Sequence, residues 1–567
     1  MSLEVKVYCE NTGEELFCAP GTTLSELAKK NGVNLKWPLL AALVDNQLKE
    51  LNFEIYVTHN VNFLDYSHPD GYRTYLRSLY FVVQKAVSDL FPTSTLILDY
   101  AIQNGMYGEL RGDVKDEKGV AETLVLDEAQ IEKLRKKVAE LIEADLPFTR
   151  KKYRTEDASK IFISQGNLEK AFLHTERGKF FTTVYYLDGY ANHFYGPLLE
   201  STGFITVYSI EMFKSGFLIK TPYMTLPYEI VEMPTQHKLF NVFKEYSDWC
   251  SILGVKNIWT LNTAIKAGKI TELIQISEAL HERKYAAIAD EIYERRDQLK
   301  LVLISGPSSS GKTTTSKRIA LQLKVLGLNP VIIELDNYFV NRENTPFDED
   351  GNRDYESLLA LDLEFLNTQL NELFEGKEIL LPKFDFAKGE RVFNGERLRL
   401  NEKDILIMEG IHGLNPRLTE KIPSHRKYSI YASALTSLSI DENNSISTSD
   451  NRLLRRIVRD NNYRGISPED TIKRWMSVRR GEIRNIFPFQ ENADIMFNSA
   501  LIYELSLLKL YAEPLLRKIP PISPASSESI RLLKFLSYIQ ELDVKDVDTV
   551  PPTSVMREFI GGSTLKY

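Results

Sequence analysis

The sequence contains few of the residues that form disulfides, zinc sites or membrane spans. Its 567 residues include three cysteines and eight histidines, and no two cysteines have CxxC spacing. We therefore expect neither a disulfide framework nor a structural zinc site, and we expect a reducing compartment. No segment reaches the roughly 18 apolar residues of a transmembrane helix, and MSLEVKVYCENTGEELF lacks the basic start and apolar block of a signal peptide. These absences favour a soluble, cytoplasmic protein with no membrane partner.

An excess of positive charge is also absent. The chain has 70 Lys and Arg against 78 Asp and Glu, which gives a net charge of −8. Nucleic acid is therefore not favoured as a partner, although a local basic run such as RKKYR at 150–154 could bind it. The hydrophobic fraction of 43% is enough to bury cores, and the length predicts about two to four domains. The sequence leaves a homo-oligomer open.

Residues 1–60 have the short alternating pattern of a small α+β domain. The predicted strands are LEVKVYC, ELFC, AALVDNQLKEL (with a turn at Asp45-Asn46) and FEIYVTH, and Thr22 or Thr23 can cap a helix. The pattern resembles the TGS domain, a ubiquitin-like module of threonyl-tRNA synthetases and some GTPases. This resemblance implies a β-grasp-like domain.

Residues 61–235 mix helices and strands. Amphipathic helices are predicted at 73–92 and 128–148, each ended by a proline, and strands at 179–190 and 204–211. Two pieces, QKAVSDLFP and FYGPLLESTG, resemble the second editing domain of threonyl- and alanyl-tRNA synthetases. The resemblance implies an α+β editing-like domain.

The editing family uses two histidines on a helix and a later Cys and His to hold zinc or the editing water. The matching positions here are Arg77, Phe81, Phe194 and Leu198. None of these side chains is a zinc ligand, so we expect the scaffold without its metal site. We expect the nearby His68 and His193 to be structural or exposed.

The rest of the chain divides into three segments. Residues 236–297 are predicted to be a helical connector, and from 298 to 515 strands alternate with helices. That alternation is typical of a doubly wound α/β domain with a parallel sheet. Residues 516–567 are predicted to form one helix and a loose tail.

ISGPSSSGKTTT, at 304–315, matches the phosphate-binding pattern GxxxxGK[ST], with the apolar strand LVLIS before it and a helix after it. The backbone N–H groups of such a loop converge on phosphates. Lys312 is expected to reach the β- and γ-phosphates, and the Thr313 hydroxyl to hold Mg²⁺. The residues expected to bind the nucleotide are Gly306, Pro307, Ser308, Ser309, Ser310, Gly311, Lys312, Thr313 and Thr314.

Two further apolar strands end in acids. VIIELDNYF places Asp336 after one strand, and ILIMEGIHGL places Glu409 at the end of another. The carboxyl ends of parallel strands face the ligand crevice, so both acids are candidates for metal or substrate binding. The alternatives are a helix cap for Asp336 and a buried, backbone-bonded acid for Glu409.

DNRLLRRIVRDNNYRG, at 450–465, is rich in arginine. Helical spacing predicts Arg452, Arg455, Arg456 and Arg459 largely on one side. Planar guanidinium groups suit phosphate, so this helix is a candidate lid over a transferring phosphoryl group. The alternative is a basic surface helix paired with nearby acids.

Residues of about 300–500 resemble the uridine kinase/phosphoribulokinase family of P-loop kinases. The matching pieces are SGPSSSGKTTT, LDNYF, RDYESLLALDLEFL, LPKFDFAKGER, ILIMEGI, RLLRRIVRDNNYRG and ENADIMFN. The resemblance implies an ATP or GTP donor, Mg²⁺, and a nucleoside-like acceptor. It makes Asp336 the general base, which also lies near the metal, and Asp354 the ligand of the ribose hydroxyls. It makes Glu409 the magnesium-associated acid, and Arg456 and Arg459 lid arginines.

The chain departs from uridine kinases where the acceptor base is read. Phe384 replaces a Tyr, Gly389 replaces a His, and Arg464-Gly465-Ile466 replaces RGR. Phe384 and Phe386 can still stack on a ring, and Arg456 and Arg464 are expected near the acceptor. Because lost hydrogen-bond donors weaken discrimination, we expect a nucleoside but leave its base open.

We therefore expect an ATP- or GTP-dependent kinase that transfers a phosphoryl group to the 5′-hydroxyl of a nucleoside, using Lys312, Asp336, Arg456 and Arg459. Two alternatives remain. One is an RNA- or tRNA-associated regulator in which the P-loop senses nucleotides. The other is a related kinase with another acceptor, such as a sugar phosphate or pantothenate.

Overall fold

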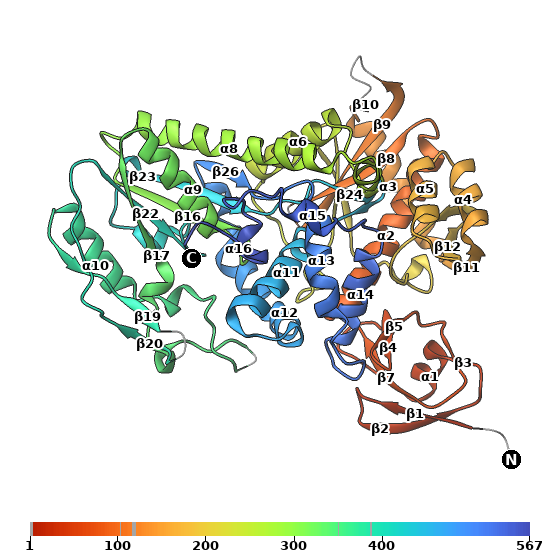
Figure 1. The fold of residues 1–567 in the computed structure, drawn as a ribbon. Coiled ribbons are helices and arrows are strands. Elements are labelled where there is room, and N and C mark those ends of the chain that lie inside the picture. The colour runs from red at the N-terminus through yellow and green to blue at the C-terminus, as the bar shows by residue number, and fades with distance from the viewer. Residues whose placement is uncertain (1–3, 103, 116–120, 350, 386–387, 567) are drawn as a thin grey trace.

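The computed structural model describes residues 4–102, 104–115, 121–349, 351–385 and 388–566. Its N-terminal part is a five-stranded mixed sheet with one helix, at the red end of Figure 1. Thr23 caps that helix by accepting the Glu26 N–H, and the expected turn at Asp45 and Asn46 has positive φ at both residues. In sheet order the strands are β2 (Glu14–Cys18), β1 (Val5–Cys9), β7 (His59–Leu64), β4 (Ala41–Val44) and β5 (Gln47–Lys49); the helix is α1 (Leu24–Lys30), and β3 (Thr22–Thr23) pairs with β6 (Glu54–Ile55).

The segment expected as one strand at 53–59 instead contributes to two. The short β6 ends at Ile55, and β7 begins at His59 and crosses the expected domain boundary at residue 60. β7 lies between β1 and β4, so it is central to the first sheet. The TGS resemblance itself stays a prediction.

The second region contains two sheets flanked by helices. One sheet has the order β10 (Ala121–Leu124), β9 (Gly105–Lys115), β15 (Gly216–Lys220) and β14 (Ser209–Phe213), and β8 (Thr95–Ile102) also pairs with β9. The other consists of β11 (Thr149–Arg154), β12 (Phe181–Leu187) and β13 (Tyr190–Asn192). The helices are α2 (Pro69–Leu90), α3 (Glu128–Glu143), α4 (Thr155–Ser164) and α5 (Leu168–Glu176).

Of the strand predicted at 204–211, only the part from Ser209 onward forms. Thr202–Phe204 is a 3-10 turn, and the strand β14 begins only at Ser209. The Thr202 hydroxyl donates to the Leu141 carbonyl at the end of α3, 2.7 Å away. This contact holds the chain against the helix end instead of a sheet.

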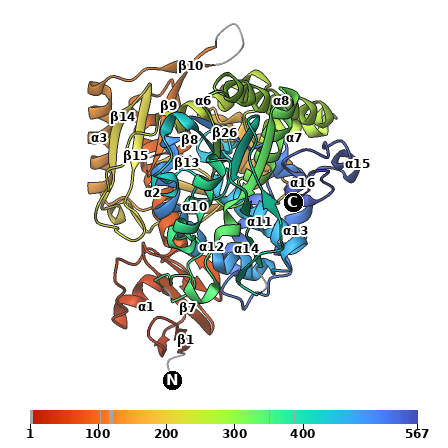
Figure 2. The ribbon, with the colours of Figure 1, turned by 90° about the vertical axis from the view of Figure 1, so that its left-hand side faces the viewer.

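Residues 236–297 are helical, as expected, with α6 (His237–Ile252), α7 (Ile258–Lys266) and α8 (Ile270–Glu294). They are more than a connector. Tyr285, Ile288 and Ile292 of α8 pack in one core with strands of the C-terminal sheet. The last helix of the front half is therefore a structural layer of the back half, as Figures 1 and 2 show.

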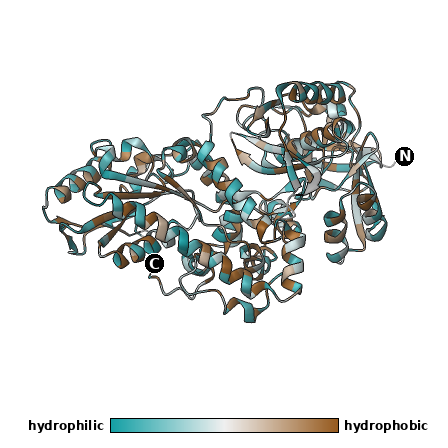
Figure 3. Cartoon of the chain, turned by 90° about the horizontal axis from the view of Figure 1, so that it is seen from above, coloured by the Kyte–Doolittle hydropathy of each residue, from teal (hydrophilic) through white to brown (hydrophobic). Residues whose placement is uncertain are grey.

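The C-terminal sheet is parallel throughout, which confirms the expected α/β architecture of this part. Val302 and Ile304 of its central strand pack toward α8 and α9, whereas Leu301 and Leu303 pack toward α10 on the other face. Figure 3 shows helices that carry both teal and brown residues. The strand order is β17 (Asn329–Glu334), β22 (Asp404–Glu409), β16 (Leu301–Ser305), β23 (Lys427–Ser433) and β26 (Ile495–Asn498), with α9 (Lys312–Val325) and α10 (Leu363–Phe374).

Helices and short ribbons complete the back half. The helices are α11 (Thr448–Arg459), α12 (Pro468–Asn485), α13 (Glu504–Leu516), α14 (Ser526–Leu536), α15 (Val544–Val547) and α16 (Arg557–Ile560). Two-stranded ribbons pair β18 (Ile379–Leu380) with β21 (Arg397–Leu398), β19 (Lys383–Asp385) with β20 (Glu390–Val392), and β24 (Ser439–Asp441) with β25 (Asn444–Ser445). Within the described residues, no helix is long and apolar enough to cross a membrane.

The expectation of a loose C-terminal tail is wrong. Beyond α14 the chain forms two more short helices and returns to the first helix of the C-terminal sheet. Arg318 of α9 donates to the Thr553 carbonyl at 2.6 Å, and Met556 and Phe559 are fully buried. Apolar side chains at these positions anchor the tail, and Figure 1 shows the C-terminus beside β16 and β17.

Candidate active site

The loop between β16 and α9 has the geometry that phosphate binding requires. A Cβ on Gly306 would lie 1.9 Å from the Ala432 carbonyl oxygen, so no larger residue fits there. Gly311 has φ +82°, a left-handed conformation that favours glycine. The loop therefore closes tightly at the N-terminus of α9, where backbone N–H groups can converge on an anion.

Lys312 lies among acids. Its ammonium donates to the Pro307 carbonyl of the same loop at 3.1 Å. Desolvation lowers the pKa of Lys312, and the negative charges of Glu409 and Asp336 oppose that shift. Lys312, Asp336 and Glu409 are far apart in the sequence, but in the fold they lie close enough for their charges to interact.

Thr313 and Glu409 form the candidate metal site. The Thr313 hydroxyl donates to the Glu409 carboxylate at 2.8 Å. Burial raises the pKa of Glu409 to about 7, with Lys312 opposing the shift and Asp336 adding to it. Among the described residues, no three His, Cys, Asp or Glu side chains gather as a metal-binding group. Mg²⁺ takes one or two protein oxygens together with phosphates and water, so this pair fits it.

Asp336 lies in the 3-10 turn Leu335–Tyr338 that directly follows β17. Desolvation raises its pKa, while the cations Lys312, Arg464 and Arg459 lower it. Its carboxylate therefore lies between the phosphate loop and the arginine-rich segment. A desolvated carboxylate is a stronger base than one in water.

Two of the four arginines of helix α11 are not free to clamp a phosphoryl group. Arg452 and Arg455 are buried and ion-paired, Arg452 with Glu482 and Arg455 with Glu504. The acid-paired alternative therefore holds for these two, because the helix is covered by α12 and α13. Arg452 also donates to the Ser308 carbonyl at 3.0 Å, so its role is to hold the phosphate loop.

Arg456 and Arg459 remain at the loop side of α11. Arg456 donates to the Ser308 hydroxyl at 2.8 Å, and both arginines bond the buried carboxylate of Asp460. Arg464 is exposed and lies 3.8 Å from Asp460. The structure thus brings Arg456 to the phosphate loop and gathers Arg459 and Arg464 near the same acid.

Sequence reasoning missed Glu482, in α12. Its carboxylate accepts the Ser308 N–H at 3.1 Å and also pairs with Arg452 and Arg479. Burial opposes ionisation, but the two guanidinium groups outweigh it and lower the pKa of Glu482 to about 2. No motif marks this residue, since its role arises from the packing of α12 on the loop.

Glu558 of α16 is a second missed residue. It accepts hydrogen bonds from both the hydroxyl and the N–H of Thr314, at 2.5 and 3.3 Å. These donors belong to the first turn of α9, where the phosphates of a nucleotide are expected. The returning tail therefore places a carboxylate on part of the predicted nucleotide site.

The predicted acceptor residues are less clearly gathered. The Asp354 carboxylate accepts the Glu356 N–H at 3.0 Å within its own turn. Glu356 itself is a further acid of the site: desolvation and Glu482 raise its pKa to about 7, while Arg456 and Lys312 lower it. No sequence motif marks Glu356, which lies two residues beyond the matched acid.

The sequence predicts that Phe384 and Phe386 stack on the acceptor base. Phe384 is buried and packs edge-to-face on Phe339, with ring centroids 5.6 Å apart. Phe386 lies outside the described residues. Base stacking by either one stays a prediction. A Cβ on Gly389 would lie 2.6 Å from Nε of Arg342, so an arginine occupies the space beside this glycine.

In the front half, the two segments that resemble an editing domain do lie together. Phe81 and Phe194 pack edge-to-face at 5.1 Å, and Arg77 donates to the Pro197 carbonyl at 3.0 Å. His193 is buried between the Thr183 carbonyl and the Tyr538 hydroxyl, and His68 caps α2. Both histidines thus have structural roles.

Comparison with known proteins concerns the C-terminal half. Residues 301–505 match the Phosphoribulokinase / Uridine kinase family. A uridine kinase of Macrococcus caseolyticus is 31% identical over 198 residues, 35% of this chain and 86% of that protein. One of Bacillus velezensis is 31% identical over 195 residues, 34% of this chain and 82% of that protein. The solved structure of a possible uridine kinase from Bacillus stearothermophilus is 17% identical, with a TM-score of 0.25, and covers 37% of this chain and all of that one (100%).

Proposed function

The chain is a kinase of the phosphoribulokinase/uridine kinase family, and on that premise we propose that it phosphorylates the 5′-hydroxyl of a nucleoside. The donor is ATP or GTP, and the products are a nucleoside monophosphate and the nucleoside diphosphate of the donor. The bond between the acceptor oxygen and the γ-phosphorus forms as the bond from that phosphorus to the β,γ-bridging oxygen breaks.

The convergence of Lys312, Asp336 and Glu409 supports this proposal most strongly. Lys312 and the loop N–H groups hold the donor phosphates, and Arg456, next to Ser308, stabilises charge on the transferring group. Asp336 accepts the acceptor proton and orients the hydroxyl. Thr313 and Glu409 would hold Mg²⁺, which neutralises phosphate charge when bound. A site that only hydrolysed or sensed nucleotide would not need a base on the acceptor side.

A second candidate is a related kinase whose acceptor carries an anionic group, such as a sugar phosphate. The observation in its favour is Arg342, whose side chain lies against Gly389. In the resemblance to uridine kinases, a histidine stands at the position of Gly389. A guanidinium group there suits a phosphate or carboxylate better than a pyrimidine.

The experiment is a screen of nucleosides, sugar phosphates and small polyols for acceptor-dependent release of ADP or GDP in the presence of Mg²⁺. We expect turnover with one or more nucleosides and little without acceptor. Turnover only with sugar phosphates would favour the second candidate. Nucleotide binding with no turnover on any acceptor, together with salt-dependent tRNA binding, would favour the regulatory alternative.

A further inference from the structure

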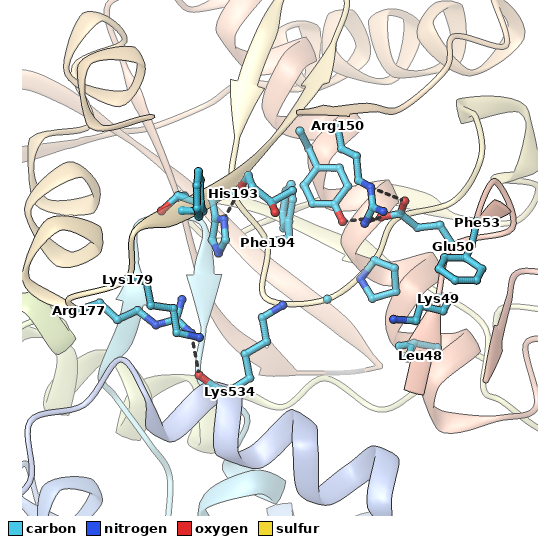
Figure 4. Close-up of a pocket in the computed structure, with 16 residues that line it drawn as sticks. Leu48, Lys49, Glu50, Phe53, Arg150, Arg177, Lys179, His193, Phe194 and Lys534 are labelled. Carbon is cyan, nitrogen blue, oxygen red and sulfur yellow. Dashed lines mark hydrogen bonds and ion pairs between the residues drawn. The ribbon is translucent and has the colours of Figure 1, made fainter. Parts of the chain in front are cut away.

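A second basic site lies in the front half, far along the chain from the phosphate loop. It is a cavity of about 320 Å³ where the first sheet, the β11–β12–β13 sheet and helix α14 meet. Five of its lining side chains are Lys or Arg and one is an acid; they are Lys49, Arg150, Arg177, Lys179, Lys534 and Glu50. Figure 4 shows Lys534 pointing from α14 between Arg177 and Lys179 on one side and Lys49 on the other.

The single acid of this cavity is already engaged. Glu50 pairs with Arg150 at 3.1 Å and accepts the Tyr185 hydroxyl at 2.6 Å. Within the described part of the chain, no carboxylate forms an ion pair with Lys49, Lys179 or Lys534.

Arg177 is likewise held by neutral groups. Nε donates to the Ser537 hydroxyl at 3.0 Å, and the guanidinium lies 3.7 Å from the centre of the Tyr538 ring. Tyr538 and Ser537 thus fix the orientation of a cation without neutralising it. Four cations therefore surround the cavity with their charge uncompensated.

Burial and repulsion between neighbouring cations lower the pKa values of two lysines at this cavity. Desolvation, together with Arg177, Arg77 and Lys179, lowers the pKa of Lys534 to about 7, and Glu50 only partly opposes the shift. Desolvation and Arg177 also lower the pKa of Lys179. Like charges held together in this way destabilise the folded protein, so a structural role does not explain them.

The size of the cavity limits the ligand. Sites for small molecules typically have volumes of about 300–1,000 Å³, and this one is at the lower end of that range. The cations lie on two sides of the cavity, with Lys534 between them. This placement on two sides suits a ligand with two linked anionic groups.

We propose that this cavity binds a small molecule carrying two phosphate groups, such as a diphosphate or bisphosphate. Arg177, Lys179 and Lys534 take one phosphate, Lys534 being shared, and Lys49 with Arg150 takes the other. Charge-assisted hydrogen bonds to guanidinium and ammonium groups supply the affinity. This site is independent of the kinase reaction, because none of its residues belongs to the phosphate loop or the acids around it.

The test uses inorganic pyrophosphate on the full chain with Lys312→Ala, which weakens binding at the phosphate loop. The lowered pKa of Lys534 favours the free amine that an amine-acylating reagent attacks, and mass spectrometry measures that modification residue by residue. We expect pyrophosphate to protect Lys534 and Lys179 saturably, leaving the exposed Lys545 unchanged. Lys534→Met should weaken pyrophosphate binding, measured by calorimetry, about ten-fold.

Removing one of several repelling charges should leave the thermal stability of Lys534→Met unchanged or higher. Thermal denaturation of this variant therefore shows whether weaker binding comes from the lost charge or from a failure to fold. Lys545→Met, at an exposed lysine, is the matched control and should keep full affinity. Absence of protection at millimolar pyrophosphate would overturn the proposal. Protection by tRNA but not by pyrophosphate would also overturn it, in favour of a nucleic-acid contact.

Discussion

Two regions of this molecule gather cations around a space for anions, and they differ in the acids that accompany those cations. At the phosphate loop, Lys312 lies within the field of Glu409, Asp336 and Glu356. The front cavity is lined by five cationic side chains and one carboxylate, that of Glu50. The first arrangement can hold a metal ion and accept a proton, whereas the second can only bind.

Charge composition thus distinguishes a catalytic site from a binding site. Phosphoryl transfer needs positive charge for the phosphates, but it also needs oxygen ligands for Mg²⁺ and a base for the acceptor. A site that has only the positive charge meets the first requirement. The comparison therefore assigns catalysis to the C-terminal half and binding to the front half.

Lys312→Ala should reduce catalysis strongly. Removing this ammonium should lower acceptor-dependent turnover by about 10²–10³-fold or more, since it stabilises the charge of the transferring phosphoryl group. Steady-state release of nucleoside diphosphate measures this loss. Lys324→Ala, at an exposed lysine of the same helix, should have little effect. Normal turnover of Lys312→Ala would contradict the assignment of catalysis to the phosphate loop.

Glu482→Gln tests whether the phosphate loop depends on its buried ion pairs. The change leaves Arg452 and Arg479 without their carboxylate, which should reduce the free energy of unfolding by about 3–5 kcal/mol. Chemical denaturation measures it. Glu469→Gln, in the first turn of the same helix, should change the free energy of unfolding little, because it removes only a solvent-screened ion pair with Lys473.

The same carboxylate gives a pH signature. Its folded pKa of about 2 lies below the ordinary value of 4.5, so its contribution to stability is present above pH 4.5 and is lost as the pH falls toward 2. The stability difference between the wild-type protein and Glu482→Gln should therefore shrink through that window. A constant difference would contradict the role of Glu482 as an ionised partner.

Glu558→Gln should change nucleotide affinity modestly. Its carboxylate now occupies the Thr314 donors that a nucleotide phosphate would use. Removing the negative charge should tighten nucleotide binding about three- to ten-fold, in line with the strength of one charge-assisted hydrogen bond. Calorimetric titration with a non-hydrolysable nucleotide measures it, and weaker binding would show that Glu558 supports the loop instead.

The sequence predicted the parts of the site that are contiguous along the chain. ISGPSSSGKTTT carries its own strand, turn and helix signals, and Asp336 and Glu409 follow apolar strands whose carboxyl ends meet at one sheet edge. Glu558 could not be found in this way, because it reaches Thr314 across 244 residues. The burial of Arg452 and Arg455 depended on which helices cover α11, and helical spacing alone does not determine that.

In the front half, too, the sequence predicts features that depend on neighbouring residues but not contacts between distant segments. The alternating strands, the Thr23 cap and the turn at Asp45 and Asn46 followed local rules and were found. The basic cavity is built from Lys49, Arg177 and Lys534, which lie in three distant segments. Each looks like an ordinary surface residue in the sequence, and only the packing of α14 on the front sheets brings them together.

Asp336→Asn separates proton acceptance from nucleotide binding. The substitution keeps the shape of the side chain but removes the base, and Glu364→Gln, at an exposed acid of α10, is the control. Acceptor-dependent release of nucleoside diphosphate should fall to background in Asp336→Asn, while the affinity for a non-hydrolysable nucleotide stays within a few-fold of wild type. Turnover that persists, or an equal loss of nucleotide binding and turnover, would contradict the assignment of Asp336 as the base of a two-substrate kinase.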